Sequence, residues 1–254
     1  MTISRYHVSK ISLTPFSELC TCYIRFTDIP CGGSANQFPS SIYLHLAEGE
    51  MKAYRIDNFI PHSEDKHFIT KFGGQPDWME RPQWPVSLAW DNRPLKFVGQ
   101  IRLNDFHYEP EKLSLAYIFM TQPKDRTDPF FDPDIMIPDE GESAVIIQPG
   151  GKIPEYIHVE DFPAGPTVDS KNIWIPQTTE TEETLTTEFK EIDADKFCGI
   201  PAFISNSKVK SDSKLLLQLH TNWLPFYVNA GGAPTMFVFL KETNDRGFIL
   251  IEDM

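Results

Sequence analysis

Three cysteines near the start of the chain come closest to the residue types and spacing of a metal centre. Cys20 and Cys22 are separated by one residue, and Cys31 follows nine positions later. Zinc sites favour cysteine pairs two to four residues apart on hairpin turns. A Cys-x-Cys pair on a strand puts both sulfurs on one face, which suits two core thiols at least as well. Both readings stay open, and we predict neither a metal site nor a cofactor.

A calcium site is the second candidate for a metal centre in the sequence. Four aspartates lie close together at Asp128, Asp132, Asp134 and Asp139. The spacing of an EF-hand and its central glycine are missing, and prolines occupy key positions, so a solvated acidic loop is the favoured reading. The sequence also lacks a phosphate-binding loop, a dinucleotide-binding glycine pattern, a Gly-x-Ser-x-Gly turn and a His-Glu-x-x-His pair. We therefore predict a non-enzymatic protein with no catalytic residues.

The negative charge of the chain is concentrated in two segments. The net charge is −13; residues 122–142 contribute −5 and residues 177–195 contribute −6. Such a field repels nucleic acid and anionic membranes and attracts basic partners. Simple solubility is the alternative reading of the same charge.

The pattern of apolar residues predicts a mostly β protein with few long helices, because prolines are frequent and interrupt helices. We expect strands at 95–103, 113–121, 144–148, 215–220, 236–241 and 248–252. The best helix candidate is Glu180–Ile192, where Thr178 or Thr179 would be the cap and the glutamates would suit the positive helix end.

No signal-peptide core precedes the first strand, and no window is as apolar as a membrane span, so we expect a cytoplasmic protein with reduced thiols. Residues 71–94 contain Trp78, Trp84 and Trp90 and are expected to form an ordered aromatic loop. Its indoles pack in the core or form a stacking platform in a cleft.

One pattern occurs twice in the chain. Residues 74–78 read Gly-Gln-Pro-Asp-Trp, and residues 199–203 read Gly-Ile-Pro-Ala-Phe. Each is followed by an apolar strand, which contains Gln100 or Gln218, and then by an aromatic-rich strand. We expect the two amides to bond backbone groups where two units meet. A repeat of this length predicts two similar units that pack together.

The predicted fold class is α+β, predominantly β, with two tandem pseudo-repeated β-rich halves packed into one globular unit. The whole chain, 1–254, forms the unit; its halves cover about 1–121 and 144–254, and an acidic, proline-rich segment, 122–143, joins them.

The repeated pattern resembles that of a known family. Residues 71–78 (Lys-Phe-Gly-Gly-Gln-Pro-Asp-Trp) and 95–101 (Leu-Lys-Phe-Val-Gly-Gln-Ile) are similar to the Lys-x-Gly-Gly-x-Pro-x-Trp and Leu-x-Phe-Leu-x-Gln-Ile patterns of the YwqG-like family of bacterial proteins. Residues 229–239 look like the Gly-rich turn of that family, without the acid usual there. A weaker likeness links the pattern to the C-terminal domain of programmed-cell-death protein 2, a chaperone for a ribosomal protein.

The resemblance implies a mixed fold with abundant β structure and no established enzymatic activity. Relatives in the family occur beside bacterial toxin genes, where small acidic proteins act as immunity partners. Taken with the charge, this predicts an immunity protein that binds a basic toxin domain, such as a nuclease. The alternatives are a chaperone or scaffold for a basic client, such as a ribosomal protein, and an undetected enzyme or small-ligand binder that uses a Trp-rich cleft.

The residues predicted to contact the partner are acids of both segments, with two phenylalanines as anchors between them. They are Asp125, Asp128, Phe130, Phe131, Asp132, Asp134, Asp139, Glu140, Glu142, Glu182 and Glu183.

Overall fold

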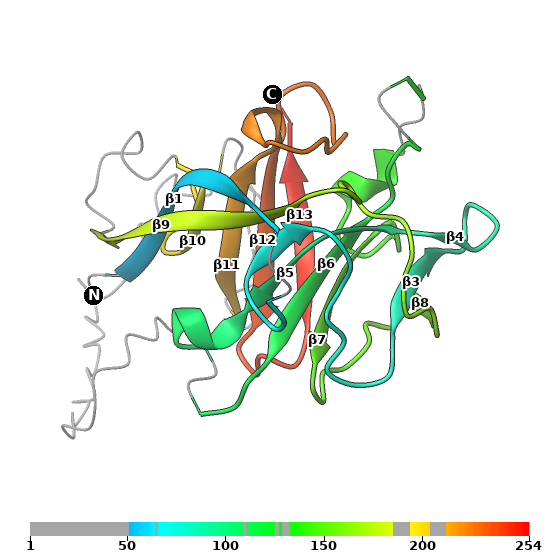
Figure 1. The fold of residues 1–254 in the computed structure, drawn as a ribbon, viewed down its shortest axis with the longest axis horizontal. Helices are drawn as coiled ribbons and strands as arrows, with labels where there is room; N and C mark the ends of the chain where they lie inside the picture. Colours follow the sequence, from blue (N-terminus) through cyan, green and yellow to red (C-terminus); the bar gives the residue numbers. More distant parts are fainter. Residues whose placement is uncertain are drawn as a thin grey trace, which may run out of the picture.

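A closed antiparallel barrel of ten strands forms the body of the molecule (Figure 1). The computed structural model describes residues 51–63, 66–108, 111–124, 127–128, 133–184, 194–203 and 212–253. Around the barrel the strands follow one another in the order β1 (Met51–His62), β10 (Lys196–Cys198), β11 (Ser213–His220), β12 (Thr235–Lys241), β13 (Gly247–Glu252), β7 (Ser143–Gln148), β6 (Leu115–Met120), β5 (Lys96–Arg102), β2 (Lys71–Gly73) and β9 (Ile173–Glu183).

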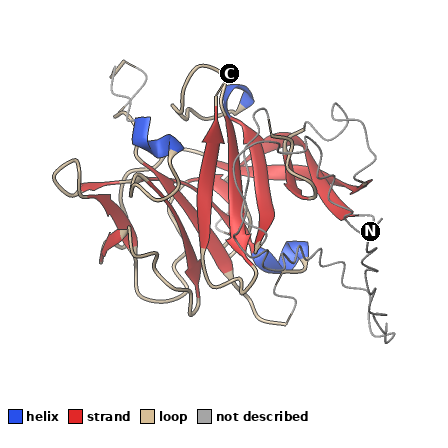
Figure 2. Cartoon of the chain, turned by 180° about the vertical axis from the view of Figure 1, so that it is seen from behind, coloured by secondary structure: helices blue, strands red, loops and turns tan. Residues whose placement is uncertain are grey.

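A small second sheet lies beside the barrel, on the side away from β1 (Figure 1). It consists of β3 (Trp84–Ser87), flanked by β4 (Arg93–Pro94) and β8 (His158–Glu160). The helices of the described residues are three short 3-10 turns at the ends of strands or in connections (Figure 2). They are η1 (Leu103–Phe106), η2 (Pro133–Met136) and η3 (Thr221–Trp223). The predominantly β prediction is therefore confirmed.

The central strands are buried on both faces, which explains why their sequences are continuous apolar runs. In β6, Ala116, Ile118 and Met120 belong to the cluster inside the barrel. Leu115, Tyr117 and Phe119 of the same strand belong to a second cluster outside it, which also contains Trp84 of β3 and is packed against Trp78. The alternation follows from the period of two along a strand.

Two groups of four strands are built alike. We call β2, β5, β6 and β7 the first unit, and β10, β11, β12 and β13 the second unit. In each unit, a three-residue strand pairs with a longer strand through a lysine and a glutamine: Lys71 lies opposite Gln100, and Lys196 lies opposite Gln218. In each unit the pairing of the longer strand with the next strand shifts register just before the glutamine. The shift lies between Phe97 and Gly99 in the first unit and between Leu215 and Leu217 in the second.

The barrel closes through strands that cross between the sequence halves. β9, from the C-terminal half, pairs along its length with β1 and at its start with β2. β1, from the N-terminal half, also pairs with β10. Because these contacts connect strands of both predicted halves in one sheet, the described parts of the halves are interleaved in the barrel rather than laid side by side.

The helix prediction at Glu180–Ile192 is wrong for its first turn. Residues 180–183 belong to β9, in which Glu180 lies opposite Tyr54 and Glu182 opposite Lys52. The threonines of this stretch favour a strand, and its pairing with β1 outweighs the capping signal. Residues 185–192 of that prediction lie outside the described residues.

Candidate interaction surface

The connection between β6 and β7 is far longer than its counterpart in the second unit. β12 and β13 are joined by five residues, 242–246, whereas β6 and β7 are joined by the 22 residues 121–142. A tight hairpin therefore suffices to link antiparallel neighbours at this place in the sheet. We call residues 121–142 the acidic connection; most of its length is not needed to join the two strands.

One part of the acidic connection belongs to the core. Ile135 in η2 is 1% exposed and packs in the cluster inside the barrel. η2 lies against β13, whose pairing with β7 among the described residues is limited to Gly247 with Val145. The apolar side chain of Ile135 thus fills the interior where the ladder between the two units is shortest.

Both ends of the acidic connection are fixed by hydrogen bonds. The Thr121 N–H donates to the carbonyl of Glu142 at 2.8 Å, which closes the base. The side chain of Gln122 donates to the carbonyl of Asn229 at 2.7 Å and accepts from the Asn229 N–H at 2.6 Å. Asn229 lies in the segment between β11 and β12 of the second unit, so this pair of bonds ties the connection, which follows β6 of the first unit, to the second unit as well.

The predicted contact residues of the connection fall into three groups. Asp139 and Glu140 are exposed, and Asp128 and Asp134 are half-buried. Glu142 is buried, and its carboxylate accepts hydrogen bonds from the hydroxyls of Ser87, at 2.5 Å, and Thr121. The prediction that Glu142 contacts a partner is therefore wrong, because its carboxylate already serves an internal site. The other predicted residues, Asp125, Phe130, Phe131 and Asp132, lie outside the described residues.

The second acidic segment also divides into exposed and buried acids. Glu182 is exposed on β9, near the pair that Glu180 forms with Lys52 at 2.9 Å. Glu183 is buried; its Oε1 lies 2.7 Å from Nζ of Lys196, and its Oε2 accepts from the Ile200 N–H at 2.7 Å. Glu183 is thus an internal counter-ion, and the prediction that it contacts a partner is corrected.

Two exposed apolar side chains, Leu88 and Trp90, stand next to the acidic connection, and the sequence prediction missed them. They are 66% and 45% exposed in the turn between β3 and β4. The carbonyl of Trp90 accepts from the Arg93 N–H at 3.0 Å, across two residues with positive φ, Asp91 and Asn92. Positive φ at both central positions is the type I′ geometry that suits a twisted hairpin. We call residues 88–92 the hairpin tip.

The base of the hairpin tip is bonded to both ends of the acidic connection. Ser87 donates to Glu142 and accepts from the Trp90 N–H at 3.2 Å. Arg93 donates to the carbonyl of Gln122 at 2.6 Å. The hairpin tip and the acidic connection are therefore held together by hydrogen bonds at their bases. The Asp-Asn pair at 91–92 was the sequence signal for this turn.

The other two tryptophans of this region are packed. Trp84 is fully buried and donates from its indole to the carbonyl of Leu95 at 2.8 Å. Trp78 packs against Tyr117 and Phe119, with ring centroids 4.9 Å and 6.1 Å away. The core-packing reading is confirmed for these two residues, and Trp90 differs from them because it lies in the hairpin tip.

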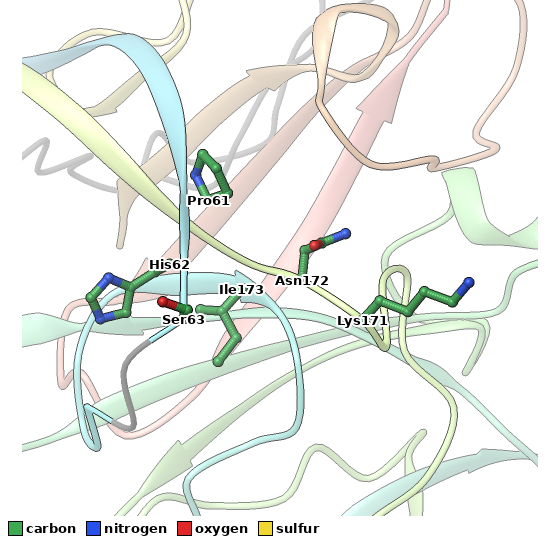
Figure 3. Close-up of a pocket in the computed structure, with 6 residues that line it drawn as sticks. All are labelled: Pro61, His62, Ser63, Lys171, Asn172 and Ile173. Atoms are coloured by element: carbon green, nitrogen blue, oxygen red, sulfur yellow. The ribbon is translucent and has the colours of Figure 1, made fainter.

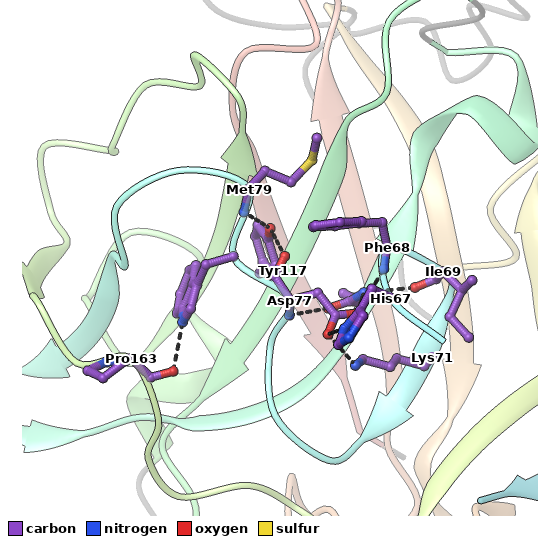
Figure 4. Close-up of polar contacts among 10 residues, drawn as sticks. His67, Phe68, Ile69, Lys71, Asp77, Met79, Tyr117 and Pro163 are labelled. Atoms are coloured by element: carbon purple, nitrogen blue, oxygen red, sulfur yellow. Dashed lines mark hydrogen bonds and ion pairs between the residues drawn. The ribbon is translucent and has the colours of Figure 1, made fainter. Parts of the chain in front are cut away.

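A second candidate site is the buried carboxylate of Asp77 (Figure 4). Its Oδ1 lies 2.9 Å from Nζ of Lys71, and its Oδ2 accepts from the Phe68 N–H at 2.9 Å and from Nε2 of Gln100 at 2.8 Å. Burial opposes ionisation of this group, but the hydrogen bond and charge of Lys71, with His67 and the Phe68 N–H, keep the pKa of Asp77 below its usual value. The carboxylate of Asp77 is thus fully engaged by groups of the protein itself, and its hydrogen bonds hold the turn at residues 74–78 in place.

The glutamines complete these turn sites within their own units. Oε1 of Gln100 accepts from the Asp77 N–H, and Oε1 of Gln218 accepts from the Ala202 N–H, each at 2.9 Å. Their amide groups donate to the carbonyls of Ile69 and Ala194. The expected bonding to backbone groups is confirmed, but these partners lie in the strand-and-turn segment of the same unit and not at an interface between the units.

Redox and metal chemistry find little support among the described residues. No three His, Cys, Asp or Glu side chains of that part of the chain come together as a metal site. Burial raises the pKa of the Cys198 thiol to about 12, despite a bond with Tyr108 that lowers it, so Cys198 is protonated and a poor nucleophile. Cys20, Cys22 and Cys31 lie outside the described residues.

A broad cavity lies where β1 ends and β9 begins (Figure 3). It has a volume of about 530 Å³, is open to solvent and is lined by Pro61, His62, Ser63, Lys171, Asn172 and Ile173. None of its lining residues is a tryptophan, so this cavity is not the Trp-rich cleft that the sequence suggested.

No protein-family model matches the chain, and no curated protein matches it. A membrane-crossing helix, which would need a long apolar stretch, does not occur in the part of the chain that the structure describes.

Proposed function

We propose that this chain is a non-enzymatic, cytoplasmic binding protein for a basic protein partner, and that the partner docks on the acidic connection and the hairpin tip. The observation that carries the proposal is the difference between the two equivalent connections. One closes in five residues, and the other uses 22 to present acids beside an exposed tryptophan.

The chemistry of this surface suits such a partner. Asp139 and Glu140 are exposed and place negative charge on one connection, while Leu88 and Trp90 offer apolar area next to its base. Interfaces of this kind combine a few aromatic anchors with charged groups at the rim. The charges accelerate association, and the anchors slow dissociation.

The resemblance to YwqG-like proteins gives the proposal its most specific form. In that form the chain is an immunity protein, and the partner is the basic domain of a toxin such as a nuclease. We also propose that the barrel derives from two tandem pseudo-repeated units. The support for this is the matched placement of Lys71 with Gln100 and of Lys196 with Gln218.

The test is the binding kinetics of this chain with a basic toxin domain encoded beside its gene. In the variant Asp139→Asn/Glu140→Gln, we expect the association rate to fall about three- to tenfold at low salt, because electrostatic steering is lost. Trp90→Ser is expected to raise the dissociation rate about tenfold or more, as for an interface anchor.

The matched control is Glu242→Gln. Glu242 is an exposed acid in the five-residue connection of the second unit, and its loss leaves the rates unchanged if the surface is as proposed. An association rate that does not depend on ionic strength contradicts the electrostatic part of the proposal. Tight binding to a basic ribosomal protein, with none to the toxin domain, favours the chaperone alternative.

A further inference from the structure

A long part of β9 has no neighbouring strand on one of its two sides. β9 pairs with β1 along its length, but on its other side it pairs with β2 at Ile173 and Trp174 only, within the described residues. No backbone hydrogen bond reaches residues 175–182 from that side in the part of the chain that the structure describes. We call residues 175–182 the free edge. Figure 1 shows β1 and β9 together as a long ribbon.

The register of β1 shows which backbone groups of the free edge point outward. The Ile56 N–H donates to the carbonyl of Asp195 at 2.7 Å, so the backbone groups of Ile56 point toward β10. Successive strand residues direct these groups to alternate sides, so those of Arg55 point toward β9 and meet Thr179. The backbone groups of Thr179 therefore point toward β1, and those of the residues on either side of it point outward.

By the same alternation, the outward backbone groups of the free edge belong to Thr178, Glu180 and Glu182. All three residues are exposed. Pro176 occupies the preceding outward position, where its missing N–H costs no hydrogen bond with β1. The N–H and C=O groups of the three exposed residues thus form an edge to which another strand can be added.

The charges beside the free edge determine which partner suits it. Side chains two residues apart on a strand lie on one face, so Glu180 and Glu182 flank the edge together. Glu180 lies 2.9 Å from Nζ of Lys52, but both side chains are more than half exposed, which makes the pair weak. Glu182 forms no ion pair with any described residue. The free edge therefore favours a positively charged strand.

The same acids oppose pairing with a second copy of this chain. Two free edges placed side by side would bring the glutamates of one copy next to those of the other, and like charges on facing strands are destabilising. Pro176 also shortens the stretch over which two copies could pair. The occupant that fits is therefore a basic strand from a different molecule.

We propose that the free edge of β9 binds an extended segment of another protein as an added strand, with lysine or arginine at every second position facing Glu180 and Glu182. Main-chain hydrogen bonds to the three outward residues hold the segment, and its alternate basic side chains give selectivity. The added strand takes the place beside β9 that β2 leaves open. None of these residues belongs to the acidic connection or the hairpin tip, so this site is separate from the surface proposed above.

The first test is amide hydrogen exchange of the full chain, measured by ¹⁵N NMR. In the free protein, we expect the amides of Thr178, Glu180 and Glu182 to exchange about tenfold or more faster than those of Thr179 and Thr181, which face β1. The probe is an alternating lysine–threonine heptapeptide with blocked ends. At saturation it is expected to slow the exchange of the three outward amides about tenfold or more.

Matched peptides separate backbone pairing from charge. N-methylation of alternate residues removes the N–H groups along one edge of the peptide, so two methylated peptides cover both edges. We expect one of them, methylated along the edge that faces β9, to bind about tenfold or more weakly, and the other to bind like the parent peptide. A peptide with glutamate in place of lysine is expected not to bind, because its charges face Glu180 and Glu182.

Variants of the protein test the same two contributions. Glu182→Gln is expected to weaken binding of the lysine peptide about two- to fivefold at low salt. Thr178→Pro removes one outward N–H and is expected to weaken binding about tenfold, whereas Thr178→Val keeps the N–H and is its control. The variant Asp139→Asn/Glu140→Gln, on the other surface, is expected to leave peptide binding unchanged. Thermal melts show whether each variant is folded.

Three results overturn the proposal. If the outward amides are as protected in the free chain as those of Thr179 and Thr181, the edge is already covered. If both methylated peptides bind as well as the parent peptide, the attraction is one of charge alone and no strand is added. If the lysine peptide does not bind at millimolar concentration, the glutamates only keep other strands away from this edge.

Discussion

Lys71 and Lys196 occupy the same position in the two units, but acids from different places neutralise them. In the first unit the acid is Asp77, six residues further along the same turn. In the second unit the corresponding residue is Ala202, and Glu183 at the end of β9 supplies the carboxylate. A buried ammonium must be paired, but the fold does not fix where the acid comes from.

The two connections between the last strands of each unit differ in the same way. The five residues 242–246 only join two strands, and the 22 residues 121–142 also fill the barrel and carry surface acids. The comparison distinguishes the residues that are required to join the strands of the barrel from the additional residues that only the first unit contains. The four predictions below test this separation, beginning with the largest expected effect.

Lys196→Met is expected to lower the free energy of unfolding by about 3–5 kcal/mol, because it leaves the buried carboxylate of Glu183 without its charge partner. Lys71→Met is expected to cost less, about 2 kcal/mol, since Asp77 keeps the N–H of Phe68 and the amide of Gln100. Urea denaturation of both variants measures the difference. Equal losses would show that the two turn sites are energetically equivalent despite their different acids.

Ile135→Ala is expected to cost about 2–4 kcal/mol, the usual loss for a large-to-small change in a core. The control is Ile137→Ala in the same connection, where the side chain is 43% exposed and about 0.5 kcal/mol or less is expected. If both variants unfold at the same denaturant concentration as the parent, the side chain of Ile135 does not stabilise the core, and the acidic connection does not contribute to it.

Gly73 and Cys198 test how strictly the units share a backbone conformation, since both have positive φ, +71° and +60°. A Cβ at Gly73 would lie 2.6 Å from the carbonyl oxygen of Asn172, so Gly73→Ala is expected to cost about 2 kcal/mol or more. Cys198→Gly relieves the strain but loses a buried side chain, and we expect a change within about 1 kcal/mol. A stable Gly73→Ala protein would mean that the backbone there adjusts freely.

The Asp77 site makes stability depend on pH. The pKa of Asp77 is lowered in the folded state, so its contribution to stability is present above the unfolded pKa, about 3.9, and is lost as the pH falls through the lower folded value. Unfolding free energies measured between pH 5 and pH 2 are expected to fall less steeply in Asp77→Asn than in the parent. Identical slopes would place the acid sensitivity at other carboxylates.

The apolar strands could be read from the sequence because their burial on both faces leaves a continuous signal. Residues 115–120, 235–241 and 247–252 form strands close to the predicted ranges. The matched glutamines could also be found, since their spacing is a local property. Residues 180–183 were misread because their threonines and glutamates satisfy a helix cap as well as a strand, and only pairing with β1 decides between the two.

The sequence by itself determined the β character of this protein, its repeated turn and strand pattern, and the concentration of acid in two segments, because composition and period are written along the chain. Only the tertiary structure decided that the strands close into one barrel, that Glu142 and Glu183 face inward, and that Trp90 faces solvent. Burial depends on which segments pack against each other in the folded chain. The sequence therefore does not show whether a given carboxylate or indole is buried or exposed.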